Sequence, residues 1–178
     1  MKILKRLGVV ALLLVFFAYG AYLGRHELTR MQEQLPSFTA AAGETQQVRI
    51  EMQDGVKLFT SVMLPEGEGP FPSVLLRNPY ARFTPIMRDT LCGRFIRYGY
   101  ACVLQDLRGQ GESEGEWSPM VNEVRDGRDT ISWLVEQPFQ DGNIAMVGPS
   151  YLASVQYAVA ASGLPSEVKT LVPAVYTT

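Results

Sequence analysis

The strongest constraint on the fold of this chain is an alternation of short apolar runs with helix-like segments, which begins near residue 73. Four apolar runs have the length of buried strands, and they occupy residues 73–77, 101–106, 143–148 and 170–175. Gly99 and Gly163 stand where two of the intervening helices are expected to end. Strands that alternate with helices are typical of βαβ units, whose strands form a parallel sheet.

An antiparallel hairpin is predicted before this alternation begins. Residues 48–53 alternate apolar with polar side chains, and residues 56–64 continue as a second strand. Asp54 and Gly55 between them are typical of a tight hairpin turn. The sequence therefore predicts an α/β fold with a mostly parallel sheet and an antiparallel hairpin at one edge. No covering helix comes after the last apolar run, so the fold is unfinished by this count.

Two helix starts are predicted from capping patterns. Thr84 and Pro85 are typical of a helix N-terminus, with Thr84 as the N-cap. Asn122 is expected to cap a later helix. The apolar residues that are expected to share the buried face of that later helix are Val124, Ile131, Leu134 and Val135.

The N-terminus is predicted to be a membrane element. Lys2, Lys5 and Arg6 precede an uncharged apolar stretch at residues 7–24, whose length is close to the shortest that spans a bilayer. We favour an uncleaved signal anchor. The alternative is a cleaved signal peptide, with a weak cleavage pattern at residues 18–20. In both cases the basic residues stay in the cytoplasm and the rest of the chain is exported.

These patterns divide the chain into three parts. Residues 1–24 are the signal anchor or signal peptide, and residues 25–47 are a polar, alanine-rich stalk without periodicity. Residues 48–178 form the folded domain, which is long enough for one core. The chain carries 16 Lys and Arg residues against 18 Asp and Glu residues, and the basic residues beyond the start are dispersed. That distribution argues against binding of nucleic acid.

The two cysteines are Cys92 and Cys102. Cys102 lies in the predicted strand at residues 101–106, where we expect it to be a small apolar core residue. A disulfide with Cys92 is the alternative in an exported domain, because disulfides persist in oxidising compartments. The spacing of Cys and His is not that of a zinc site, and we expect neither a metal nor an organic cofactor.

Ser150 lies at the junction of an apolar strand-like run and a helix-like run, directly after Gly148 and Pro149. A nucleophile elbow needs such a junction, because a sharp turn exposes the serine hydroxyl and small residues let the backbones approach. The N-terminus of the next helix also favours negative charge that develops nearby. The alternative is a serine that caps the helix. Leu152 departs from the usual Gly-x-Ser-x-Gly pattern.

Four ordered segments of the chain carry a resemblance to a known family. They are DGVKL, LLRNPYAR, GYACVLQDLRGQGESEGEW and DTISWLVEQPFQDGNIAMVGPSY. In this order and at this spacing they resemble the CocE/NonD type of α/β-hydrolase, the group of cocaine esterase and Xaa-Pro dipeptidyl-peptidase. The resemblance covers residues 48–178 and only the N-terminal portion of the family's fold, through the nucleophile elbow. It implies a serine hydrolase that cleaves ester or amide bonds, including Xaa-Pro dipeptidyl bonds, through an acyl-enzyme.

The resemblance also implies roles for individual residues. Ser150 would be the nucleophile. The hydroxyl of Tyr80, in the Asn-Pro-Tyr motif, would bind the oxyanion together with the backbone N–H of Tyr151. Fixed donors suit this step, since negative charge develops on the carbonyl oxygen during acyl transfer. Without the resemblance, Tyr80 would be interpreted as a turn aromatic packed on the core.

The chain departs from the family downstream of Ser150. The family's triad Asp and His lie beyond the nucleophile, yet the 28 residues after Ser150 contain neither, and the one histidine, His26, lies in the predicted stalk. A serine hydroxyl without a base is a poor nucleophile. We therefore expect an N-terminal fragment that is inactive by itself. The alternative is a catalytically inactive, membrane-tethered binding module. Ala145 and Ala153 replace usual glycines, a change small enough for the elbow to survive.

The loop after residue 106 contains charged residues for which we expect no direct catalytic role. Asp106 and Arg108 are expected to hold a loop in place, as charged residues at the end of a strand often do. Glu112, Glu114 and Glu116 are expected to form a solvated acidic loop, because nothing in their spacing fixes a metal-ligand geometry.

Overall fold

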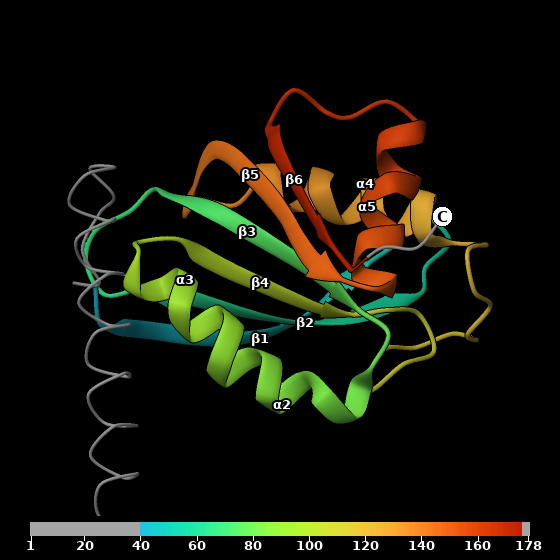
Figure 1. Ribbon diagram of the computed structural model, residues 1–178, viewed down its shortest axis with the longest axis horizontal. Coiled ribbons are helices and arrows are strands. Elements are labelled where there is room, and N and C mark those ends of the chain that lie inside the picture. Colours follow the sequence, from blue (N-terminus) through green and yellow to red (C-terminus); the bar gives the residue numbers. More distant parts are fainter. Residues whose placement is uncertain (1–39, 176–178) are drawn as a thin grey trace, which may run out of the picture. The chain divides into compact units, whose positions relative to one another are not determined.

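A computed structural model describes residues 40–175, which form a six-stranded mixed sheet with helices on both faces (Figure 1). The strands are β1 (Ala42–Glu51), β2 (Lys57–Pro65), β3 (Phe71–Asn78), β4 (Ala101–Asp106), β5 (Gln140–Pro149) and β6 (Val168–Ala174). Their order in the sheet is β1-β2-β4-β3-β5-β6. β1, β2 and β4 pair antiparallel, whereas β4, β3, β5 and β6 run parallel. The predicted mostly parallel sheet with an antiparallel edge is confirmed.

The predicted hairpin joins β1 and β2. The N–H of Gly55 donates to the carbonyl of Met52 at 2.8 Å, and Gly55 has a φ of +83°, which glycine adopts without strain. The strand before the turn is longer than expected. β1 begins at Ala42, so the last six residues of the predicted stalk belong to the sheet and the boundary at residue 48 is wrong.

A helical run from Ala81 to Arg97 comes after β3. It comprises the 3-10 turn η1 (Ala81–Phe83), α2 (Thr84–Met87), the π-helical turn η2 (Arg88–Cys92) and α3 (Gly93–Arg97). Gly99 lies just beyond its end with a φ of +82°, as predicted. The predicted capping role of Thr84 is wrong, because the N-cap of α2 is Phe83 and Thr84 is the first helical residue. The later helices are α4 (Glu123–Val135) and α5 (Tyr151–Ala161).

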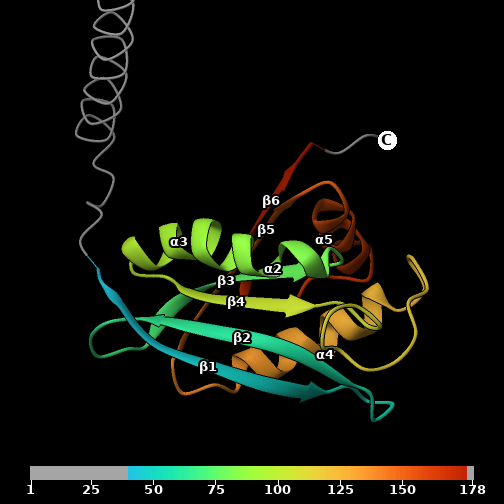
Figure 2. The same cartoon turned by 90° about the horizontal axis from the view of Figure 1, so that it is seen from below.

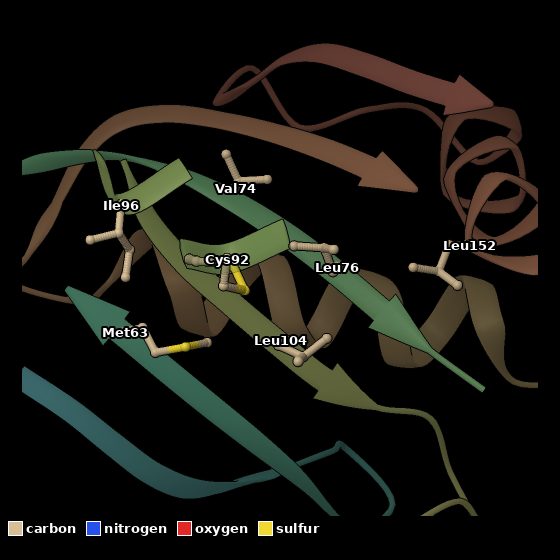
Figure 3. Close-up of a cluster of buried hydrophobic side chains, with 8 residues drawn as sticks. Met63, Val74, Leu76, Cys92, Ile96, Leu104 and Leu152 are labelled. Atoms are coloured by element: carbon tan, nitrogen blue, oxygen red, sulfur yellow. A yellow bond between two sulfur atoms is a disulfide. The ribbon is translucent and has the colours of Figure 1, made fainter. Parts of the chain in front are cut away.

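The core lies on both faces of the central strands, since successive side chains of a strand point to opposite faces. Leu76 of β3 and Leu104 of β4 pack against η2 and α3 (Figure 3). Their sequence neighbours Leu75 and Val103 pack against α4 and α5. Figure 2 shows the same arrangement, with α2 and α3 on one side of β4 and α4 on the other.

Cys92 and Cys102 form a disulfide that joins η2 to β4 within the first of these clusters (yellow bond in Figure 3). Both residues are fully buried. The burial of Cys102 agrees with the sequence, whereas its expected role as a simple apolar core residue is wrong. The bond fixes the last residue of η2, within the helical run, to the central strand β4.

The predicted signal anchor and His26 lie outside the described residues, as do most of the predicted stalk and residues 176–178. Within residues 40–175, no helix is long and apolar enough to cross a membrane. The membrane element therefore stays a prediction from the sequence.

Candidate active site

Ser150 stands at the tip of a strained turn between β5 and α5. Its φ is +56° and its ψ is −125°, a conformation that costs a non-glycine residue about 1–3 kcal/mol. The surrounding backbone holds it there: the N–H of Ser150 donates to the carbonyl of Ala174 at 2.9 Å, and its carbonyl accepts from the N–H of Ala153 at 2.8 Å. The serine is exposed. The turn thus has the geometry that a nucleophile elbow needs.

The hydroxyl of Ser150 does not cap α5, so the capping alternative is wrong. Its Oγ instead lies 3.0 Å from the Oη of Tyr80, a residue 70 positions earlier in the chain. β3 and β5 are parallel neighbours, and their arrowheads in Figure 1 point the same way, so the turns at their carboxyl ends meet at one edge of the sheet. The structure brings the predicted nucleophile and the predicted oxyanion tyrosine into contact.

Gly148 and Leu152 explain why the elbow tolerates its unusual sequence. Gly148 has a φ of +147°, and a Cβ at this position would overlap the side chain of Leu152. Leu152 is 1% exposed and packs with the residues of η2 and α3. Leu152, two residues after the serine, thus fills space in the core beneath the turn. Ala153, which replaces a usual glycine, is also fully buried.

Tyr151 is the first residue of α5, and the N–H groups of a first helical turn have no partner within the helix. The backbone N–H of Tyr151 is therefore not used within α5, which an oxyanion donor requires. Its side chain has a role that the sequence did not indicate. The Tyr151 hydroxyl donates to Oε1 of Glu123 at 2.6 Å and accepts the N–H of Met120 at 2.8 Å, and its ring packs on Trp117.

The anchoring of Tyr151 keeps its hydroxyl protonated. Burial is the main cause that raises the pKa of the Tyr151 hydroxyl above its ordinary value, and the hydrogen bond to Glu123 acts in the same direction. Glu123 itself is 4% exposed. The residue after the nucleophile is therefore fixed through its backbone in α5 and through its side chain to the start of α4.

A buried arginine, Arg77, contacts Glu123, the residue that accepts the Tyr151 hydroxyl. Arg77 of β3 is 1% exposed, donates from Nε to Oε1 of Gln105 at 2.9 Å and donates from Nη1 to the carbonyl of Glu123 at 2.8 Å. Burial lowers the pKa of the Arg77 guanidinium to about 10, while Asp126 and Glu123 act in the opposite direction, so Arg77 is a cation at neutral pH. An arginine inside an apolar strand was the signal for this cluster that sequence reasoning passed over.

Asp106 and Arg108 hold loops in place, as the sequence predicts. Arg108 donates to both carboxylate oxygens of Asp126, at 2.9 and 2.7 Å, and forms an ion pair with Asp54 at 2.9 Å. These contacts tie the β1–β2 turn to α4. Asp106 accepts the hydroxyl of Thr84 at 2.7 Å. Glu112, Glu114 and Glu116 are exposed, as expected.

The part of the chain that the structure describes contains no histidine, since His26 precedes it. Within that part, no three side chains of the kinds that bind metals gather in one place. The site thus consists of the exposed hydroxyl of Ser150, the hydroxyl of Tyr80 and the first backbone N–H of α5. This arrangement can form a covalent bond to a carbonyl carbon and stabilise the resulting oxyanion, provided that a base activates the serine.

Comparisons with known proteins show which family the chain resembles. The sequence profile of the family described as X-Pro dipeptidyl-peptidase (S15 family) matches residues 54–178. The cocaine esterase of Rhodococcus sp. (strain MB1 Bresler) is 43% identical over 120 residues, which are 66% of this chain and 21% of the esterase. The chain spans about a fifth of the length of the curated relatives it matches.

Solved structures show the same relationship. An alpha-amino acid ester hydrolase superposes with a TM-score of 0.64 at 33% identity, over 73% of this chain and 25% of the hydrolase. A CocE/NonD family hydrolase from Staphylococcus aureus superposes with a TM-score of 0.61 at 28% identity, over 74% of this chain and 27% of that protein. The mixed sheet and its helices are therefore similar to the folds of CocE/NonD hydrolases.

Proposed function

The chain belongs to the X-Pro dipeptidyl-peptidase S15 family, and from this premise we propose that it is the nucleophile-bearing part of a serine hydrolase. The observation that carries the proposal is the contact of 3.0 Å between Tyr80 Oη and Ser150 Oγ at the tip of the strained turn. A serine that served only the fold would gain nothing from this conformation, because its hydroxyl does not cap the helix.

The proposed reaction proceeds through an acyl-enzyme. Ser150 Oγ attacks the carbonyl carbon and gives its proton to a base, and the carbonyl oxygen becomes an oxyanion between the Tyr80 hydroxyl and the Tyr151 N–H. The C–O or C–N bond then breaks, the leaving group takes the proton, and water releases the acyl group by the reverse steps. Neither Asp nor His occurs after Ser150 in this sequence, so the proposed acid and base would come from a further segment of the full-length protein.

Ester bonds are the substrate class that we propose. The cocaine esterase and the alpha-amino acid ester hydrolase are 43% and 33% identical to this chain, and the names of both indicate ester substrates. The family description favours a second candidate, the release of Xaa-Pro dipeptides, which uses the same acyl-enzyme chemistry on an amide.

The test is an assay of the full-length protein with p-nitrophenyl acetate and with Ala-Pro-p-nitroanilide. We expect turnover of the ester, with a kcat/KM at least tenfold above that for the anilide, and covalent labelling of Ser150 by a fluorophosphonate. The 178-residue chain should remain unlabelled, because it lacks a base. A full-length protein that neither turns over a substrate nor reacts with the probe would instead be the inactive binding module.

We also propose that residues 48–178 lie outside the cytoplasm, anchored by residues 1–24 or released after cleavage. The basic start, the apolar stretch and the disulfide between Cys92 and Cys102 support this location. A reporter that functions only outside the cytoplasm should be active when it is fused after residue 60. Activity of a cytoplasm-only reporter at the same junction would refute the location.

A further inference from the structure

The turn that carries Tyr80 depends on side-chain hydrogen bonds for its shape. β3 ends at Asn78, and the chain passes through Pro79 and Tyr80 before η1 begins. The Asn78 side chain bridges this turn: its Oδ1 accepts the N–H of Tyr80 at 2.9 Å, and its Nδ2 donates to the carbonyl of Tyr80 at 3.3 Å. Asn78 is fully buried, so its amide orientation determines where the backbone of Tyr80 lies.

The Asn78 amide is held in turn by Thr84 and Asp106. Nδ2 of Asn78 donates to Oγ1 of Thr84 at 2.8 Å, and that hydroxyl donates to Oδ1 of Asp106 at 2.7 Å. Asp106 is the last residue of β4 and is 3% exposed. A continuous series of hydrogen bonds therefore runs from the end of β4, through the first residue of α2, to the backbone of Tyr80.

The direction of these hydrogen bonds is fixed by the N–H of Tyr80. A backbone N–H only donates, so Asn78 must present Oδ1 to Tyr80 and turn its Nδ2 toward Thr84. The Thr84 hydroxyl then accepts from Nδ2 and donates its own proton to Asp106. Burial raises the pKa of the Asp106 carboxyl, and donors from Thr84, the Glu112 backbone and Asn78 counteract this effect by favouring the ionised form.

The contacts of Thr84 argue against a purely local role in helix capping. Thr84 occupies the position at which the sequence predicts an N-cap, yet no side-chain hydrogen bond caps α2. Its hydroxyl is committed to Asp106, a residue 22 positions away. Gly111 packs so closely on Oδ2 of Asp106 that a Cβ there would overlap it, which confines the carboxylate.

We propose that Asp106, Thr84 and Asn78 are positioning residues that hold the hydroxyl of Tyr80 at Ser150. The inference rests on the proposed role of Tyr80 as an oxyanion donor. It identifies the residues that fix the position of Tyr80 relative to the sheet. A donor gains its effect from being fixed before the charge develops, and displacement of a catalytic group by about 1 Å costs on the order of 10²-fold in rate.

The experiment compares Thr84→Val with Thr84→Ser by NMR of the 178-residue chain, labelled at tyrosine Cζ and studied in detergent. Tyr80→Phe assigns the Tyr80 signal, and Ser150→Ala shows how that signal moves when the hydroxyl loses its partner. We expect Thr84→Val to move the Tyr80 signal in the same direction, whereas Thr84→Ser, which keeps the hydroxyl, leaves it near its original position. Thr90→Val is the matched control, since the Thr90 hydroxyl donates to Ile86 on the same helical run, and it should leave the Tyr80 signal unchanged.

This readout does not require hydrolysis, so it separates the positioning of Tyr80 from the proposed function. In the full-length enzyme, Thr84→Val should lower kcat about ten- to a hundredfold with little change in KM, and Thr84→Ser should recover most of that loss. A folded Thr84→Val protein with an unmoved Tyr80 signal would overturn the inference. If Thr84→Val does not fold, Asp106→Ala, which removes the acceptor of the Thr84 hydroxyl, decides by the same signal: displacement of Tyr80 supports the inference and an unmoved signal overturns it.

Discussion

Replacement of Ser150 by alanine should abolish hydrolysis by the full-length protein, with kcat lowered on the order of 10⁶-fold. The side chain would lose the only atom that forms the bond to the substrate, while both oxyanion donors would stay in place. The fold should persist, because the Ser150 hydroxyl caps no helix and its hydrogen bond to the Tyr80 hydroxyl is exposed. Steady-state turnover of p-nitrophenyl acetate and the thermal midpoint, measured on the same preparation, check both parts of this expectation.

Ser154→Ala is the matched control for this experiment. Ser154 lies one helical turn further along α5, and its hydrogen bond to the carbonyl of Ser150 is made by the backbone N–H, which the substitution keeps. We expect this variant to keep wild-type turnover and fluorophosphonate labelling. If Ser150→Ala retained more than about a hundredth of the wild-type kcat, another group would be the nucleophile and the hydrolase proposal would have to be rebuilt around it.

The features that the sequence predicted well depend on patterns within short segments. The period of apolar residues indicated the parallel strands, and Asp54 with Gly55 indicated the hairpin. The junction at Ser150 could be interpreted as an elbow because a strand, a glycine and a helix succeed one another directly. The strained φ of +56° at Ser150 could not be predicted, because a serine that caps a helix has the same local sequence.

The start of β1 was missed because this part of the strand lies at the edge of the sheet. Residues 42–47 are exposed on both faces, so they have no alternation of apolar and polar side chains. In α4 the sequence predicted more buried residues than the structure has. Ile131 and Leu134 are fully buried as predicted, whereas Val124 and Val135 lie at the margin of the buried face and are more than a third exposed.

Contacts between distant segments could not be predicted from one sequence. The disulfide forms because a residue of η2 happens to lie over β4, with the two Cα atoms 5.4 Å apart. Thr84 has the local pattern of an N-cap, but an acceptor on β4 outcompetes the backbone of its own helix. In the same way, Glu123 and Tyr151 meet only once α4 and α5 have packed.

Replacement of Tyr80 by phenylalanine should lower kcat on the order of 10²- to 10³-fold, which corresponds to about 3–4 kcal/mol of transition-state stabilisation. Only one hydroxyl is removed, and the aromatic ring keeps its edge contact with Phe83. The loss should fall on kcat rather than KM, because the hydrogen bond strengthens as charge develops on the carbonyl oxygen. Steady-state kinetics of the full-length protein with p-nitrophenyl acetate check this split.

Tyr100→Phe provides the matched control for the Tyr80 variant. Tyr100 directly precedes β4, so it lies at the amino ends of the parallel strands, whereas Tyr80 follows the carboxyl end of β3, and the ring of Tyr100 packs on Phe95. Tyr100→Phe should leave kcat within about twofold of wild type. The thermal midpoint should change little for Tyr80→Phe as well, because the Tyr80 hydroxyl and its partner Ser150 face solvent, so no buried donor or acceptor is left unpaired. A Tyr80→Phe enzyme with kcat within about threefold of wild type would make Tyr80 a turn aromatic only. The oxyanion would then depend on the Tyr151 N–H and a donor elsewhere, and the series of hydrogen bonds from Asp106 would serve the fold alone.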